Sequence, residues 1–94
     1  MDTLPSEQIE QRLTDLDGWS FEDDAITKTF EFDEFMDAVG FINAVAAKAD
    51  AANHHPDLHN SYTTVNVTLT THSAGGVTTK DLDLAREIEE LEAI

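Results

Sequence analysis

The chain has 94 residues, of which 40% are hydrophobic and none is cysteine. This length is typical of one small domain, so we expect a single domain over residues 1–94. The lack of cysteine excludes disulfide bonds and thiolate metal sites. No apolar run approaches the ~20 residues of a membrane-spanning helix, and no N-terminal run resembles a signal peptide. We therefore expect a cytoplasmic protein.

The charge is strongly one-sided, with 20 Asp and Glu residues against five Lys and Arg residues and a formal net charge of −15. Phosphate binding needs clustered Lys and Arg, so nucleic acid and anionic membranes are disfavoured as partners. Apolar residues recur at regular spacing, which favours a folded domain over an acidic disordered chain. Such a surface is typical of proteins from salt-loaded cytoplasm, because a Debye length of ~3 Å at ~1 M salt screens self-repulsion.

The N-terminal third of the chain predicts a helix followed by a hairpin. Residues 5–16 carry apolar side chains at helical spacing, and Gly18 is suited to end that helix. Residues 19–21 and 26–32 alternate between apolar and polar side chains, as strands do. The polar run at 22–24 is the expected turn between them.

A long second helix is expected next, with Asp33 as its N-cap and its end near Asp50. A polar loop should follow over residues 51–57. The apolar face expected for this helix consists of Phe35, Val39, Ile42 and Ala46, widened by Met36, Phe41 and Val45.

The C-terminal part predicts two strands and a last helix. A short strand is expected around 58–61 and a longer one at 63–71, followed by a turn at 73–77 that contains two consecutive glycines. Thr78 and Asp81 have the spacing of a capping box that opens a helix. The buried stripe expected for that helix is Leu84, Ile88 and Leu91.

The predicted order of elements is α-β-β-α-β-β-α. Each predicted helix has one apolar stripe, and each strand has one apolar parity. The simplest arrangement is an α+β fold of two layers: a four-stranded, mostly antiparallel sheet with three helices on one face. The other face of the sheet would then carry the polar side chains that alternate with the apolar ones along each strand.

The most unusual local feature is a cluster of histidines, since His54, His55, His59 and His72 all fall within nineteen residues. Three interpretations are open. The histidines could be structural, they could bind a metal, or they could serve as acids and bases near neutral pH. Adjacent imidazoles are awkward for a metal site, because neighbouring side chains of an extended loop point in different directions. No nucleophile or phosphate-binding loop accompanies them, which favours a dehydration, hydration or isomerisation.

The spacing of these residues resembles that of the pterin-4a-carbinolamine dehydratases. The family pattern is an acidic residue, three positions, His-His-Pro, then an aromatic residue, a further His and a final Asp. Gly18-Trp19 and Phe30-x-Phe32 are similar to the family as well, so the resemblance covers nearly the whole chain. The residues that match the pattern are Asp50, His54, His55, Pro56, Tyr62, Thr71, His72, Thr78 and Asp81.

The resemblance implies dehydration of a 4a-hydroxytetrahydropterin to the quinonoid dihydropterin and water, without metal or organic cofactor. It implies that His54 and His72 transfer protons and that His55 binds the pterin, with some acid/base help. Asp50 would orient His54 or stabilise its protonated form. The supporting residues expected around the substrate are Asp50, Pro56, Tyr62, Thr71 and Asp81.

The chain departs from the family pattern at two positions. Many members have Glu where Asp50 stands, and some have Trp near Leu58. His59 has no counterpart in the pattern, so we expect no role for it. The family also implies a homodimer or homotetramer, which edge strands and the third helix could form.

Two points of function stay open in the sequence. The alternative to an enzyme is a non-catalytic pterin-binding or dimerisation module, since some animal members of the family partner a homeodomain transcription factor. The physiological role could be cofactor recycling for an aromatic amino acid hydroxylase or a step related to molybdopterin.

Overall fold

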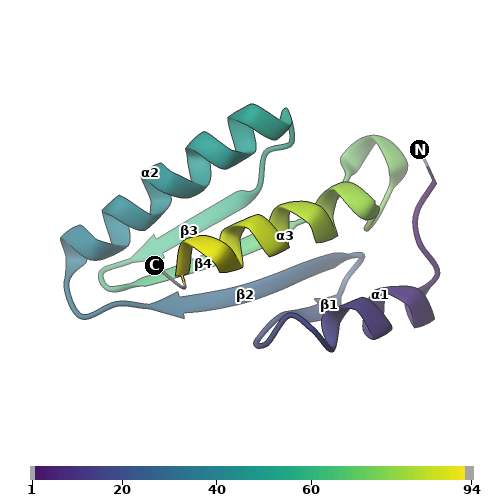
Figure 1. Ribbon diagram of the computed structural model, residues 1–94, viewed down its shortest axis with the longest axis horizontal. Helices are drawn as coiled ribbons and strands as arrows, with labels where there is room; N and C mark the ends of the chain where they lie inside the picture. The colour runs from purple at the N-terminus through teal and green to yellow at the C-terminus, as the bar shows by residue number, and fades with distance from the viewer. Residues whose placement is uncertain (1, 93–94) are drawn as a thin grey trace.

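Across residues 2–92, which the computed structural model describes, four strands form one antiparallel sheet in the order β1-β2-β4-β3. The expected α+β class and the expected order of elements are confirmed. Figure 1 follows the chain through them. The elements are α1 (Ser6–Leu13), β1 (Ser20–Glu22), β2 (Ala25–Glu31), α2 (Phe35–Ala52), β3 (Asp57–Ser61), β4 (Thr64–Leu69), the 3₁₀ turn η1 (His72–Ala74) and α3 (Thr79–Glu92).

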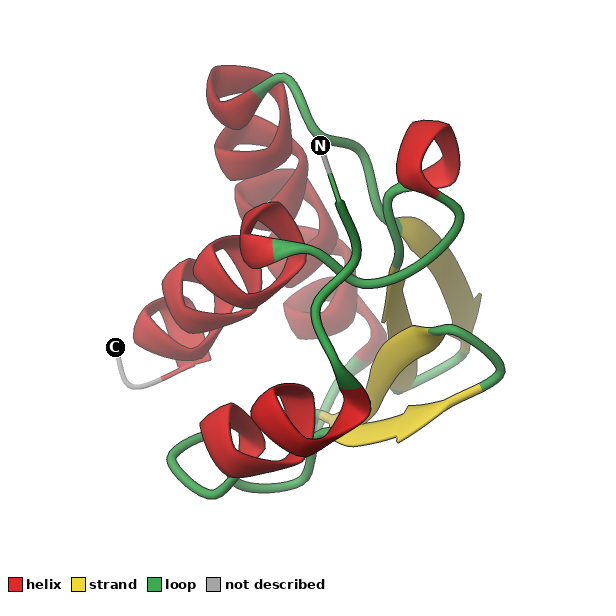
Figure 2. Ribbon diagram, turned by 90° about the vertical axis from the view of Figure 1, so that its right-hand side faces the viewer, coloured by secondary structure: helices red, strands yellow, loops and turns green. Residues whose placement is uncertain are grey.

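The two faces of the sheet differ as the alternation predicted. Ile26 pairs with Leu69 and Phe30 with Val65, and all four are buried on the inner face. Figure 2 shows α1, α2 and α3 on one side of the strands, with the opposite side uncovered. The uncovered face carries a ladder of hydrogen-bonded polar side chains: Thr27, Thr29, Asn66 and Thr68.

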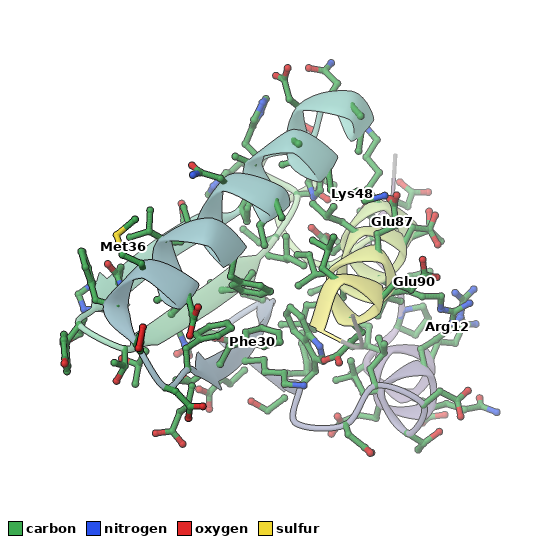
Figure 3. The ribbon with its side chains drawn as sticks, turned by 60° about the vertical axis from the view of Figure 1, so that its left-hand side comes forward. Arg12, Phe30, Met36, Lys48, Glu87 and Glu90 are labelled. Atoms are coloured by element: carbon green, nitrogen blue, oxygen red, sulfur yellow. The ribbon has the colours of Figure 1, made fainter. Side chains whose placement is uncertain are left out.

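The core lies between the inner face and the helices. Phe30 packs against Phe41 of α2 with ring centroids 4.7 Å apart, and its edge meets Trp19 at 6.1 Å. In Figure 3 Phe30 lies between the sheet and the helices, whereas Met36 points away from them. No helix within residues 2–92 combines the length and hydropathy that crossing a bilayer requires.

One charged side chain enters the inner face of the sheet. Lys28 lies opposite Val67, and its ammonium group donates to Glu89 Oε1 on α3 at 2.5 Å and to the Asp17 carbonyl at 2.8 Å. The indole N–H of Trp19 donates to the same Glu89 oxygen at 2.7 Å. This cluster ties the first hairpin to the last helix.

The first helix is shorter than predicted, because it ends at Leu13 instead of residue 16. The Thr14 hydroxyl donates to the Gln11 carbonyl, and the next amides form bonds to carbonyls three residues back. The chain therefore tightens into turns before Gly18, whose φ of 86° ends the segment. Leu16 is still buried, as its spacing predicted.

The second helix begins one residue later than predicted. Glu34, and not Asp33, occupies the N-cap position, and its side chain makes no capping hydrogen bond. The buried residues of α2 are Ala38, Phe41, Val45 and Ala49. The face that we expected first, through Phe35, Val39, Ile42 and Ala46, is instead partly or fully exposed.

The last strand is also shorter than predicted, since β4 ends at Leu69 and not at residue 71. Thr71 forms an isolated bridge with Gly76, and η1 begins at His72. Gly75 ends η1 with a φ of 81°, a conformation that glycine adopts without strain. The expected turn after β4 therefore closes on itself and holds His72 beside the start of α3.

Candidate active site

The C-terminus of α2 places the adjacent histidines. Asn53 ends the helix in the left-handed conformation, with φ 52° and ψ 41°, and the His54 amide donates to the Ala49 carbonyl at 3.0 Å. This reversal sends the two neighbouring side chains to different environments. The side chain of His54 is 11% exposed, whereas that of His55 is 65% exposed.

The turn after β4 places the third histidine. The Thr71 amide donates to the Gly76 carbonyl at 2.9 Å, which closes the loop around η1. Thr71 is buried at the base of this loop, and His72 is exposed at its start.

These two segments meet around a hollow of about 290 Å³. The structure thus brings together the three histidines that the family pattern singles out, although His72 lies 17 positions after His55 in the chain. Within residues 2–92, no three His, Asp or Glu side chains converge as a metal site requires. The hollow is lined by Asn53, His54, His55, Thr70, Thr71, His72, Ser73 and Lys80.

The carboxylate of Asp81 lies behind His54 and is fully buried. Its Oδ1 is 2.5 Å from His54 Nε2. Its Oδ2 accepts the Thr71 hydroxyl at 2.8 Å and the Thr78 amide at 2.9 Å. The predicted capping box is confirmed by the Thr78 amide, and the same carboxylate also contacts an imidazole of the hollow. Asp81 therefore joins the start of α3 to His54.

Asp50 lies beside His55 and not beside His54. Its Oδ1 is 3.8 Å from His55 Nε2, and its side chain is 89% exposed. The carboxylate that contacts His54 is Asp81. The two acidic residues of the pattern thus contact different histidines: the exposed Asp50 lies near the exposed His55, and the buried Asp81 bonds to His54.

Other residues of the pattern lie outside this hollow. Pro56 lines a neighbouring, mostly apolar hollow of about 500 Å³ together with Asp50 and His55. Tyr62 lies in the β3–β4 turn, at the other end of β4 from the histidines, and stacks on Phe35 with centroids 6.4 Å apart. Its side chain does not enter the core, because Tyr62 is 72% exposed.

Sequence reasoning missed two features of the site. Lys80, in the first turn of α3, contributes a cation to the hollow of a protein whose net charge is −15. Thr78 matches the family pattern and the capping box, but neither predicts that its hydroxyl lies 2.8 Å from that of Thr71. The available signal was the position of both residues beside Asp81. Their relation to the loop before α3 depends on the tertiary fold.

Known proteins resemble this chain over nearly its whole length. The family model described as "Pterin 4 alpha carbinolamine dehydratase" matches residues 2–91. A provisionally named pterin-4-alpha-carbinolamine dehydratase from Sulfurisphaera tokodaii is 46% identical over 97% of this chain and 98% of its own length. A relative with the same name from Roseiflexus sp. is 47% identical over 94% of this chain and 95% of its own length.

Solved structures resemble the chain as well. The crystal structure of a transcriptional coactivator/pterin dehydratase from Brucella melitensis superimposes with a TM-score of 0.91, at 39% identity over 96% of this chain and 98% of that chain. A pterin dehydratase-like RuBisCO assembly factor of the alpha-carboxysome shares the fold, with a TM-score of 0.64 at 22% identity over 78% of this chain and 84% of its own. The extent of the match to the family model and to full-length relatives shows that this chain belongs to the pterin-4a-carbinolamine dehydratase family.

Proposed function

We propose that the protein dehydrates a 4a-hydroxytetrahydropterin to the quinonoid dihydropterin in the cytoplasm, as a step in recycling a pterin cofactor. The observation that carries the proposal is the position of His54, His55 and His72 around one hollow, with His54 bonded to the buried Asp81. The reaction needs only proton transfers, and imidazole is the side chain whose charge changes near neutral pH.

The chemistry needs one acid and one base. An imidazolium gives a proton to the 4a-hydroxyl, the C4a–O bond breaks and water leaves. A neutral imidazole takes the ring N–H proton, and the electron pair of that N–H bond forms the new C=N bond. Groups positioned in this way typically contribute ~10²–10⁴-fold each.

His54 is suited to the base. A proton on Nε2 donates to Asp81 Oδ1, which leaves Nδ1 as the ring nitrogen that exchanges a proton with a substrate. Once His54 has accepted that proton, the adjacent carboxylate stabilises the imidazolium. His72 is the partner suited to the acid, because it lines the same hollow and its side chain is exposed. His55 would bind the pterin beside them.

The test is stopped-flow absorbance of a synthetic 4a-hydroxytetrahydropterin in molar KCl. We expect the wild type to accelerate dehydration above the spontaneous rate, and His54→Ala and His72→Ala each to lose at least about tenfold. His59→Ala is the matched control, because His59 lies opposite Asn66 in the strand register and does not line the hollow. If folded wild type gives no acceleration, the enzymatic proposal is wrong.

The alternative is a non-catalytic pterin-binding or interaction module. The observation in its favour is the exposed apolar surface at the start of α2, where Phe35 is 44% and Met36 68% exposed. The Brucella melitensis relative is also described as a transcriptional coactivator. Folded protein that binds a pterin in a titration but leaves the dehydration rate unchanged would favour this module.

The same surface supports self-association as a homodimer or homotetramer. Val39 and Ile42, which are partly buried, continue this apolar side of α2 beyond Met36. Burying apolar side chains between copies would stabilise a small domain. Sedimentation velocity should show an oligomer that Met36→Asp dissociates and Gln11→Asp, on α1, leaves intact. A wild type that sediments as a monomer at micromolar concentration would contradict this.

A further inference from the structure

The carboxylate that holds His54 is itself held by two hydroxyl groups in series. Thr71 and Thr78 have their Oγ1 atoms 2.8 Å apart, and Thr71 Oγ1 lies 2.8 Å from Asp81 Oδ2. Both threonines are buried, with 5% and 0% exposure. This pair lies where the closed loop after β4 meets the start of α3.

The direction of these hydrogen bonds follows from counting protons. A hydroxyl has one proton, and Thr71 gives its proton to Asp81 Oδ2. The bond between the two hydroxyls must therefore be donated by Thr78 to Thr71. Thr78 Oγ1 in turn accepts the Lys80 amide at 3.2 Å. The hydrogen bonds thus run in one direction, from the Lys80 amide through the hydroxyls of Thr78 and Thr71 to the carboxylate of Asp81.

This arrangement determines what Asp81 can offer to His54. Oδ2 is occupied by two donors, the Thr71 hydroxyl and the Thr78 amide, so only Oδ1 remains for the imidazole. A carboxylate oxygen only accepts, so the hydrogen bond to Oδ1 is donated by an N–H at Nε2. His54 is then held as one tautomer in one ring orientation.

We propose that Thr71 and Thr78 are positioning residues, whose hydroxyls act in series through Asp81 to hold His54 with its proton on Nε2 and Nδ1 free for a substrate. The role in catalysis rests on the proposed dehydratase function, whereas the hold on His54 does not. Helix capping alone does not account for the arrangement. The cap needs the Thr78 oxygen and the Asp81 carboxylate, but the Thr71 hydroxyl comes from another segment.

Thr71→Val is the most informative variant, because it removes the hydroxyl, keeps the side-chain shape and leaves the capping box intact. We expect kcat to fall about tenfold with KM little changed, as the loss of one hydrogen bond to a charged group predicts. Thr71→Ser restores the hydroxyl and should restore kcat. Thr79→Val is the matched control at the first residue of α3.

The second readout is independent of activity. Long-range ¹H–¹⁵N correlation spectra of the histidine rings should show His54 as the Nε2-protonated tautomer in the wild type. In Thr71→Val and in Thr78→Val these resonances should move towards a mixture of tautomers. Thr78→Val will also destabilise α3 by removing the cap. Urea unfolding measures this loss of stability separately from the change in the His54 resonances.

Because the hydroxyls act in series, the Thr71→Val/Thr78→Val double variant should have the same kcat as the less active single variant. Its fold-loss in kcat should not equal the product of the two single fold-losses. Losses that multiply would overturn the proposal, as would unchanged kcat and unchanged His54 resonances in Thr71→Val. If the wild type has no dehydratase activity, the resonances still decide whether the threonines position His54. In that case only the proposed function would fail.

Discussion

His54 Nε2 lies 2.5 Å from Oδ1 of Asp81, and the other oxygen of this carboxylate accepts the Thr78 amide and so caps α3. A capping box ordinarily joins two residues of one helix start. Here the carboxylate also binds a side chain that follows the preceding helix, 27 residues earlier. The position of a candidate catalytic imidazole is therefore coupled to the integrity of a helix terminus.

Asp81→Asn should lower kcat at least about tenfold and reduce stability at the same time. The two oxygens of Asp81 accept hydrogen bonds from His54 and from Thr71, whereas the asparagine amide has only one oxygen, so one buried donor loses its acceptor. The variant also loses the charge that stabilises an imidazolium. Stopped-flow rates and urea midpoints would be compared with Asp83→Asn, which changes an exposed carboxylate on the same helix. A variant with wild-type kcat would contradict the role of Asp81.

Asp50→Asn should change the rate by less than about threefold. Its carboxylate is 89% exposed and 3.8 Å from His55 Nε2, and an exposed pair of this kind contributes about 0–1 kcal/mol. Rates measured in dilute buffer and in molar KCl would show whether even this effect is screened. A tenfold loss in both would mean that Asp50 contacts the substrate directly.

Glu89→Ala should lower the free energy of unfolding by about 1–3 kcal/mol. The substitution removes the acceptor of the Trp19 indole N–H and the counter-charge of Lys28, both partly or fully buried. Glu90→Ala is the control, since Glu90 is next to Glu89, has an exposed side chain and makes neither contact. Urea unfolding would measure both variants, and equal midpoints would show that the cluster contributes nothing.

The unfolding midpoint should rise between dilute buffer and molar KCl. A net charge of −15 on 94 residues destabilises the folded state by self-repulsion, and ~1 M salt reduces the Debye length to ~3 Å. Thermal unfolding followed by circular dichroism over a KCl series would measure this. NaClO₄ at the same ionic strength separates screening from ion-specific effects. A midpoint independent of KCl would mean that repulsion is not a significant term.

The differences between prediction and structure have local causes. Helical spacing showed that α2 is amphipathic but not which of its two apolar sides faces the sheet, because both are hydrophobic. The structure buries Phe41 and Val45 and leaves Phe35 and Met36 outside. The end of α1 depended on i to i−3 hydrogen bonds around Thr14, which no periodicity reveals.

The sequence alone determined the order of the elements, the polar and apolar faces of the sheet and the resemblance to the dehydratase family, because these depend on local periodicity and on the spacing of residues. Only the tertiary structure decided that Asp81 contacts His54, that Asp50 contacts His55, and that Tyr62 lies apart from the histidine hollow. The contact of Asp81 with His54 joins residues 27 positions apart and depends on how α2, the loop after β4 and α3 pack together. The contact of Asp50 with His55 is local, but it depends on the left-handed turn at Asn53, which reverses the chain between them. Residue spacing alone specifies neither the packing of distant segments nor the direction in which each histidine leaves that turn.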